Sequence, residues 1–154
     1  MARRIKRVTI ADPKSRDDGK TFILTEMPAD QAEWWAARAF LALTNAGAEV
    51  PEGAQAAGMA GFAIMGVQAL YQLRAEILKP LLDEMFECVR YEHDQKHAPQ
   101  PIQAGQLSQI EEVATRLKLR LELLELHTGF SGLGAQLTSA LKPQADPLPG
   151  LPIT

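Results

Sequence analysis

An uncharged stretch from Gly53 to Leu73 constrains the fold more than any other part of the chain. Its sequence, GAQAAGMAGFAIMGVQALYQL, is long enough to cross a bilayer as a helix, because about 20 apolar residues suffice. Alanine and glycine supply most of its apolar character, however, and it contains the polar residues Gln55, Gln68 and Gln72. We therefore favour a buried helix in a soluble protein over a membrane span. Three glycines inside this helix would allow neighbouring backbones to approach closely, at Gly58, Gly61 and Gly66.

The composition favours one intracellular domain. The chain has 154 residues and a formal net charge of −3, which gives no general reason to expect nucleic-acid binding. The basic N-terminus, with Arg3 and Arg4, runs into further charged residues, so we expect no secretory signal. The single cysteine, Cys88, excludes an internal disulfide and is typical of a reducing cytoplasm.

Two β-like runs near the N-terminus predict a hairpin. Residues 4–11 place Val8 and Ile10 on one face, and residues 21–27 do the same with Phe22 and Leu24. The intervening DPKSRDDGK is rich in turn residues, so we expect a mobile tip. A lone hairpin is marginally stable in water, so its apolar face must lie on helices or join the strands of another chain.

Helical periodicity predicts two helices flanking the central stretch. The first begins at an N-cap, Asp30, ends at Gly47, and buries a face of Trp35, Ala39, Ala42 and Leu43 that Trp34 and Phe40 extend. The second follows a break at Pro80 and has one apolar stripe, formed by Leu81, Leu82, Met85, Phe86 and Val89. Residues 93–105 are polar and contain proline, which predicts a flexible connection.

The last helix is predicted from Ser108, its N-cap, to Thr128. Glu112 and Arg116 have the i,i+4 spacing of an ion pair on its solvent side. Its buried stripe is predicted to comprise Ile110, Val113, Leu117, Leu121 and Leu124. Leu119, Leu123 and Leu126 widen the apolar surface and indicate a second contact.

Together these elements predict a mainly α fold. We expect a small domain of about four helices with an N-terminal two-stranded β-hairpin over residues 1–131, followed by a flexible tail over residues 132–154. The tail is predicted to be disordered because of its composition, which includes Pro143, Pro147, Pro149 and Pro152.

The sequence predicts no catalytic, cofactor or metal site. His93 and His97 have a spacing that can bind zinc on a helix, but the segment has the composition of a polar loop. Cys88 lies beside an apolar stripe and is expected to be a small core residue. The glycines of the central stretch do not follow a strand, so neither phosphate-binding motif applies. We therefore expect a binding or assembly protein and not an enzyme.

Four segments resemble small tail assembly chaperone proteins of long-tailed, siphovirus-like bacteriophages or prophages. In chain order they are GKTFILTEMPADQAEWWAARAFLAL, AGMAGFAIMG, PLLDEMFECV and IEEVATRLKLRLELLELHTGFS. The resemblance implies a small helical protein with a short hairpin that acts in the host cytoplasm. It further implies binding to the tape measure protein, which stays soluble while tail tube subunits assemble around it, with the major tail tube protein as a second partner. The family has no active site to transfer to this chain.

Eight large apolar residues are the candidates for partner binding. Tryptophan is frequent at binding hot spots and methionine adapts to irregular partners. The candidates are Trp34, Trp35, Met59, Phe62, Met65, Leu119, Leu123 and Leu126. For each of them, burial in the core of this chain is the alternative.

Other functional classes stay open. A tail-completion or neck protein retained in the virion would use the hairpin to join sheets between subunits, and a homo-oligomeric ring or dimer fits the glycine-rich helix. A holin-like membrane protein would depend on residues 53–73 alone.

Overall fold

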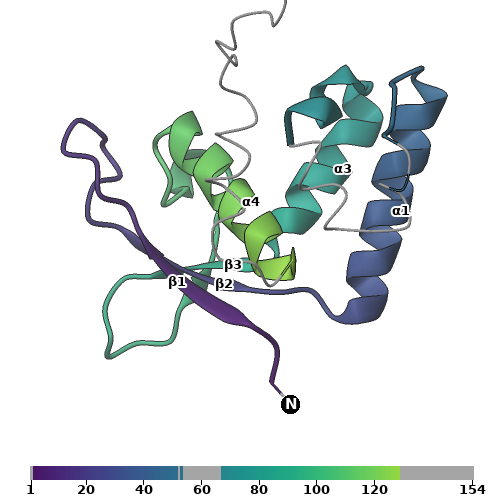
Figure 1. Ribbon diagram of the computed structural model, residues 1–154. Helices are drawn as coiled ribbons and strands as arrows, with labels where there is room; N and C mark the ends of the chain where they lie inside the picture. Colours follow the sequence, from purple (N-terminus) through teal and green to yellow (C-terminus); the bar gives the residue numbers. More distant parts are fainter. Residues whose placement is uncertain (1, 52, 54–66, 129–154) are drawn as a thin grey trace, which may run out of the picture.

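The computed structural model describes residues 2–51, 53 and 67–128, and shows a layer of helices on a four-stranded antiparallel sheet (Figure 1). The sheet has the strand order β1-β2-β3-β4. The described residues form three α-helices, α1, α3 and α4, and two short 3-10 helices, η1 and η2. The prediction of a mainly α fold is therefore wrong, and the chain has a mixed fold of helices and sheet.

The predicted hairpin is present, but it forms only half of the sheet. Strand β1 (Ile5–Thr9) pairs with β2 (Thr21–Thr25), with Val8 opposite Phe22. Strand β2 also pairs with β3 (Val89–Glu92), with Leu24 opposite Val89, and β3 pairs with β4 (Gln100–Pro101). These facing residues are buried under the helices, which lie on one side of the sheet in Figure 1. The apolar face of the hairpin is thus covered by helices of its own chain.

The region predicted as a flexible connection, residues 93–105, contains β4 and the loop that joins it to β3 in a second hairpin. The sequence analysis assigned Val89 to a helical stripe, but α3 ends at Phe86 and the chain enters β3 three residues later. Short strands carry too little periodicity to be recognised locally. Residues 89–92 become a strand because they pair with β2. Before this pairing, the free edge of β2 offers unpaired backbone donors and acceptors.

The helices predicted around α1, α3 and α4 are present, but their bounds differ from the predicted ones. Helix α1 (Ala29–Asn45) follows Pro28, so Asp30 lies in the first turn and is not the N-cap, whereas Gly47 has the expected left-handed φ of 82° after the helix end. Helix α3 (Ala75–Phe86) contains Pro80 and does not begin there. Helix α4 spans Val113–Thr128, and the 3-10 helices span Val67–Gln72 (η1) and Gly105–Leu107 (η2).

The tip of the first hairpin is fastened to α4, contrary to the predicted mobility. The side chain of Asp17 is fully buried, and its two oxygens accept hydrogen bonds from the backbone N–H groups of Glu111 and Glu112, both at 2.9 Å. Lys20 donates to Asp17 at 2.9 Å and to the carbonyl oxygen of Gln109 at 2.7 Å. Asp17 therefore caps a helix that begins almost 100 residues later, a role that the sequence analysis gave to Ser108.

The hydrogen bonds to Asp17 also determine its charge state. Burial alone would raise the pKa of its carboxyl group, but the hydrogen bonds from Lys20, from Thr115 and from the two backbone N–H groups together lower the pKa to about 2. The carboxylate is thus ionised at neutral pH, where it interacts favourably with the N-terminus of α4.

One apolar core lies between the sheet and the helices. The indole Nε1 of Trp35 on α1 donates a hydrogen bond of 3.0 Å to the carbonyl oxygen of Leu81 on α3. This contact satisfies the polar edge of a fully buried aromatic side chain. The largest fully buried apolar side chains of the described residues are Phe22, Leu24, Trp35, Leu43, Leu70, Met85, Leu119, Leu123 and Leu124.

Two predictions concern residues outside the described ranges. The predicted central helix lies mostly in residues 54–66, which include Gly58, Gly61 and Gly66, and the predicted tail lies in residues 129–154. Leu70 and Leu73 at the end of the central stretch belong to the core. Within the described ranges, the helices are all too short or too polar to cross a membrane.

Candidate partner-binding surface

The structure separates the eight predicted partner-binding residues. Trp35, Leu119 and Leu123 are fully buried in the core, and Leu126 packs against the core with partial exposure. Trp34 is exposed. The remaining three candidates lie outside the described residues, namely Met59, Phe62 and Met65. Of the described candidates, Trp34 is thus the one whose side chain is largely available to a partner in this conformation.

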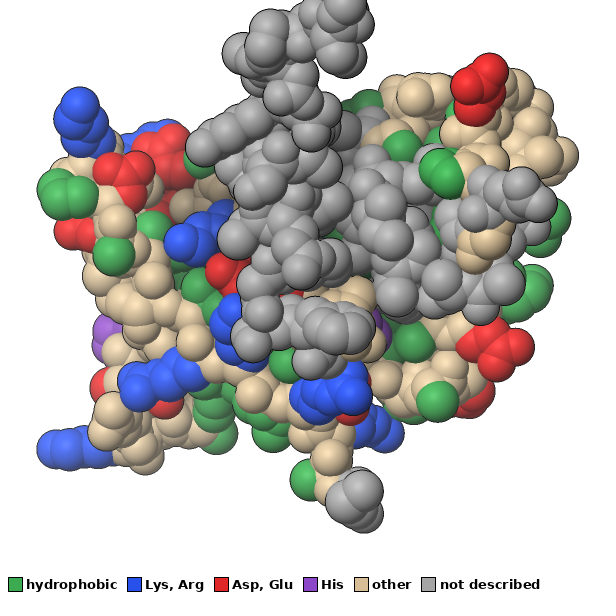
Figure 2. All heavy atoms as spheres, viewed as in Figure 1, with side chains coloured by type: hydrophobic (Ala, Val, Ile, Leu, Met, Phe, Trp, Pro, Cys, Tyr) green, Lys and Arg blue, Asp and Glu red, His purple; other side chains and the backbone are tan. Residues whose placement is uncertain are grey.

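Trp34 belongs to an exposed strip along α1. Its side chain is 60% exposed, and Leu41, seven residues later on the same helix face, is also exposed. Arg38 lies between them, with its guanidinium carbon 5.7 Å from the centre of the Trp34 ring. Arg38 also forms an ion pair with Glu84 on α3. Figure 2 shows hydrophobic side chains reaching the surface on the α1 side of the molecule.

The larger exposed apolar surface lies on α4, on the face predicted to be buried. Val113, Leu117 and Leu121 are 72%, 41% and 37% exposed, respectively, whereas Leu119, Leu123 and Leu124 are buried. The structure therefore reverses most of the predicted assignment of the leucines of this helix. Ile110 and Leu124 are the members of the predicted stripe that are buried.

Of these exposed residues, Val113 and Leu117 line a groove between α3 and α4. Its volume is about 320 Å³. Helix α3 contributes Leu78 and Leu82, α4 contributes Val113 and Leu117, and Tyr71 of η1 also lines the groove. We refer to this feature as the α3–α4 groove. Ligand sites in proteins combine such apolar walls with a few polar groups.

Two arginines of α4 supply polar groups in this groove. Arg116 and Arg120 lie one turn apart, and their guanidinium carbons are 4.1 and 4.4 Å from the centre of the Phe86 ring. Glu112, the predicted i,i+4 partner of Arg116, instead pairs with Arg16 of the first hairpin at 2.8 Å. Burial lowers the pKa of Arg120 to about 10, and the nearby charge of Arg116 adds to this shift, so the guanidinium remains protonated at neutral pH.

The sequence contained a signal for this pair that the sequence analysis missed. Arg120 has Arg116 and Leu117 one turn before it, and Leu123 and Leu124 one turn after it. A helical arginine on a wet surface commonly has an acidic neighbour at one of these spacings. An arginine surrounded by leucine and a second arginine is therefore expected to lie against an aromatic ring or a partner.

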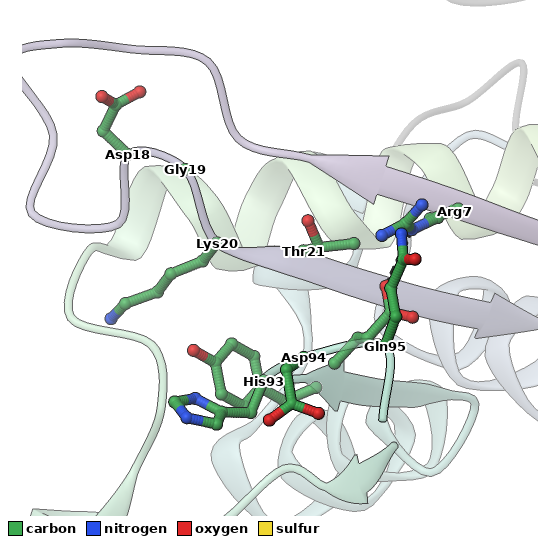
Figure 3. A pocket seen from close by; sticks show the side chains of 10 residues that line it. Arg7, Asp18, Gly19, Lys20, Thr21, His93, Asp94 and Gln95 are labelled. Carbon is green, nitrogen blue, oxygen red and sulfur yellow. Dashed lines mark hydrogen bonds and ion pairs between the residues drawn. The ribbon is translucent and has the colours of Figure 1, made fainter. Parts of the chain in front are cut away.

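A second hollow, at the β2 and β3 end of the sheet, is polar but internally neutralised (Figure 3). It has a volume of about 300 Å³. Arg7 forms an ion pair with Glu92 at 2.7 Å, and Lys20 forms one with Asp17 at 2.9 Å. Figure 3 shows the side chain of Lys20 pointing away from Arg7. Asp94 accepts a hydrogen bond of 2.8 Å from the ring of His97, which lies 3 residues later in the sequence. Because these charges are already paired, they do not converge on a ligand.

The titratable side chains of the described ranges offer no nucleophile or metal set. Burial, followed by the charges of Glu87 and Glu84, raises the pKa of the Cys88 thiol to about 11, which leaves it protonated and unreactive at neutral pH. The described residues hold no group of three or more side chains that could bind a metal ion.

His127 has a structural role in the described part of the chain. Its Nε2 accepts a hydrogen bond of 2.8 Å from the backbone N–H of Met27, and its Nδ1 lies 2.8 Å from the carbonyl oxygen of Leu123. The imidazole is therefore neutral, with the proton on Nδ1. A cation would be favoured at this helix C-terminus, but both ring nitrogens of His127 are already used in the neutral form.

Comparison of the chain with protein-family models, curated proteins and solved structures found no match. The candidate surface is therefore argued from its own geometry and from the segments quoted above.

Proposed function

We propose that this protein is a tail assembly chaperone, which binds an apolar helical segment of a tape measure protein in the host cytoplasm and keeps it soluble while tail tube subunits assemble. The observation that carries the proposal is the α3–α4 groove, with Val113, Leu117 and Leu121 exposed along one face of α4. Grooves of this kind bind amphipathic helices through apolar residues spaced one turn apart. The quoted sequence segments supply the choice of partner.

The proposed partner contact involves exposed apolar residues of α4 in place of the buried leucines that the sequence suggested. Leu119 and Leu123 are buried in the core of this chain, so the partner would pack on Val113 and Leu117, which line the groove. Each large apolar side chain that becomes fully buried contributes about 1.5 to 3 kcal/mol before the costs of association. A few such contacts are enough for reversible binding, as a chaperone that releases its client requires.

Co-expression with the long tape measure protein encoded downstream tests the proposal. Tagged wild-type protein is expected to retain the tape measure protein and to keep it in the supernatant. Val113→Lys and Leu117→Lys place a charge in the groove, and should each reduce the retained amount at least tenfold. Ala114→Lys is the matched control, because Ala114 is exposed on the same helix and does not line the groove.

An insoluble tape measure protein that is not retained by the wild-type protein would contradict the proposal. Equal retention by wild type, Val113→Lys and Leu117→Lys would leave the chaperone role in place but would show that the partner binds another surface. Trp34→Ala then tests the strip on α1.

The alternative proposal, a structural tail protein that stays in the virion, draws on the position of β1. This strand lies at an edge of the sheet that the described residues form, where a second copy could add a strand. Detection of the protein in purified particles, together with a ring-sized species in size-exclusion chromatography, would favour this alternative. Its absence from particles is expected for the chaperone.

A further inference from the structure

We propose that the α3–α4 groove recognises an acidic side chain on its helical partner, through Arg116 and Arg120. This inference rests on the proposed function and specifies the chemistry of the segment that is bound. The segment would carry a glutamate or aspartate flanked by apolar residues at helical spacing.

The two guanidinium groups form a ready site for a carboxylate. Both lie over one aromatic ring, that of Phe86, and the i,i+4 spacing places them on the same face of α4. The arginine guanidinium presents its donors in a plane, which matches the two oxygens of a carboxylate. Stacking on a ring reduces the freedom of these side chains, so less entropy is lost when they bind.

The burial of Arg120 favours the binding of an anion. Only 5% of this residue is exposed, and its Nε has no hydrogen-bond partner among the residues that the structure describes. Over residues 2–51, 53 and 67–128, no carboxylate forms an ion pair with Arg116 or Arg120. Asp83, the acidic residue that lines the same groove, pairs with Lys79 at 2.6 Å. A buried charge that the described residues leave without an ion-pair partner is costly, so a carboxylate supplied from outside would be bound strongly.

The surroundings of the pair favour an amphipathic helix over a free acidic peptide. Leu78, Leu82 and Leu117 form apolar walls beside the guanidinium groups. When a partner covers these walls it excludes water, and the attraction between the carboxylate and the arginines increases. Since Lys79 and Asp83 neutralise each other, the arginines leave the groove positively charged, which disfavours a basic segment.

The first experiment measures the free, full-length protein. Arg120→Met replaces the buried charge with an apolar side chain of similar length, and should raise the melting temperature by about 2 to 5 °C. Lys118→Met, which removes an exposed cation two residues away, should leave the melting temperature within about 1 °C of wild type. A fall in melting temperature with Arg120→Met would show that the charge is already compensated, and would overturn the inference.

The chain itself contains two acidic side chains outside the described ranges, Glu52 and Asp146. Glu52→Gln and Asp146→Asn test them as occupants. If either change lowers the melting temperature of wild type but not of Arg120→Met, the carboxylate comes from this chain, and the proposal of a partner carboxylate is overturned. Equal melting temperatures for these variants and wild type are the expected result.

The second experiment uses an array of overlapping 20-residue peptides from the downstream tape measure protein, probed with the purified full-length chain. Wild type should bind peptides with an acidic residue between apolar residues, and replacing that residue with its amide should weaken binding at least tenfold. Arg116→Met and Arg120→Met should lose the same peptides, whereas Lys118→Met should retain them.

The outcomes separate the two proposals. Retention of the tape measure protein with no effect of either arginine, and with bound peptides that lack acidic residues, would overturn the inference alone. Failure of the wild-type protein to retain the tape measure protein or any of its peptides would overturn the proposed function, and the inference with it.

Discussion

Asp17 is the residue on which the attachment of the first hairpin to α4 depends. Its carboxylate accepts hydrogen bonds from Glu111, Glu112 and Lys20, and it has no access to solvent. Asp17→Ala should lower the free energy of unfolding by about 2 to 4 kcal/mol, because it removes a helix cap and leaves a lysine without its partner. Denaturant titration checks this value. The exposed Glu33→Ala should change the free energy by less than about 0.5 kcal/mol, and equal effects of the two substitutions would contradict the proposed cap.

The pKa of Asp17 predicts how stability depends on acid. The folded-state pKa of about 2 lies below the ordinary aspartate pKa of 3.8, so the unfolded chain binds more protons between these pH values. The stabilisation is therefore present above about pH 4 and is lost as the pH falls through 2, with a total of about 2 kcal/mol. Asp17→Asn should remove this part of the pH dependence. If the curves of wild type and Asp17→Asn remain parallel below pH 4, the predicted shift is wrong.

His127 predicts a second and milder acid sensitivity. Burial lowers its pKa from the value of 6.5, and protonation of Nε2 would oppose a donor, the N–H of Met27. Since the folded pKa lies below the unfolded one, its contribution is complete above pH 6.5 and declines as the pH falls below that value. Nitrogen-15 NMR of the imidazole should show the Nδ1–H tautomer at neutral pH. A midpoint at or above 6.5 would contradict the buried, neutral ring.

The elements illustrate how far a local pattern determines packing. The sequence predicted α1, the part of α3 that follows Pro80, and α4, because each has a clear apolar periodicity. It failed to identify the buried face of α4, since leucines at 117, 119, 121, 123, 124 and 126 surround most of the helix. Packing on the sheet determines which leucines are buried. Helix α4 contacts β1 and β2, and Leu119 and Leu123 are fully buried. The arginine pair was missed for the same reason, since its environment depends on Phe86 of α3.

Paired substitutions on α4 test the orientation of this helix. Leu123→Ala should cost about 2 to 5 kcal/mol of unfolding free energy, because it opens a cavity in the core. Leu117→Ala should cost less than about 1 kcal/mol, since this side chain borders the groove and is partly solvated. Chemical denaturation measures both values. A larger loss for Leu117→Ala would restore the orientation that the sequence suggested.

At the scale of the whole molecule, the sheet could not be predicted from the sequence because its central pairing is non-local. Phe22 lies opposite Tyr91, and Leu24 opposite Val89, across most of the described chain. Local propensity identified β1 and β2 as a hairpin that needed a cover, which was correct. It could not identify β3, whose four residues become a strand through their backbone bonds to β2.

The two adjacent tryptophans report whether the whole molecule is assembled as described. Trp35 is buried between α1 and α3, and Trp34 is exposed. Trp34→Phe should therefore leave a protein with blue-shifted emission that acrylamide quenches weakly. Trp35→Phe should leave red-shifted emission and quenching that is several-fold stronger. Similar spectra for the two variants would show that α1 does not pack on α3.

The capping of α4 by Asp17 also has a consequence for the order of events on the ribosome. Asp17 and Glu111 are 94 residues apart in sequence. At about 5 to 20 residues per second, synthesis of the intervening chain takes roughly 5 to 20 s. The helix α1, then α3 and β3, are synthesised within this time, but α4, which packs on β1 and β2, is not. Until α4 is made, part of the apolar face that includes Phe22 and Leu24 is open to other nascent chains and to chaperones. The speed of translation across residues 26–111 thus determines how long the N-terminal hairpin stays without the segment that its tip binds.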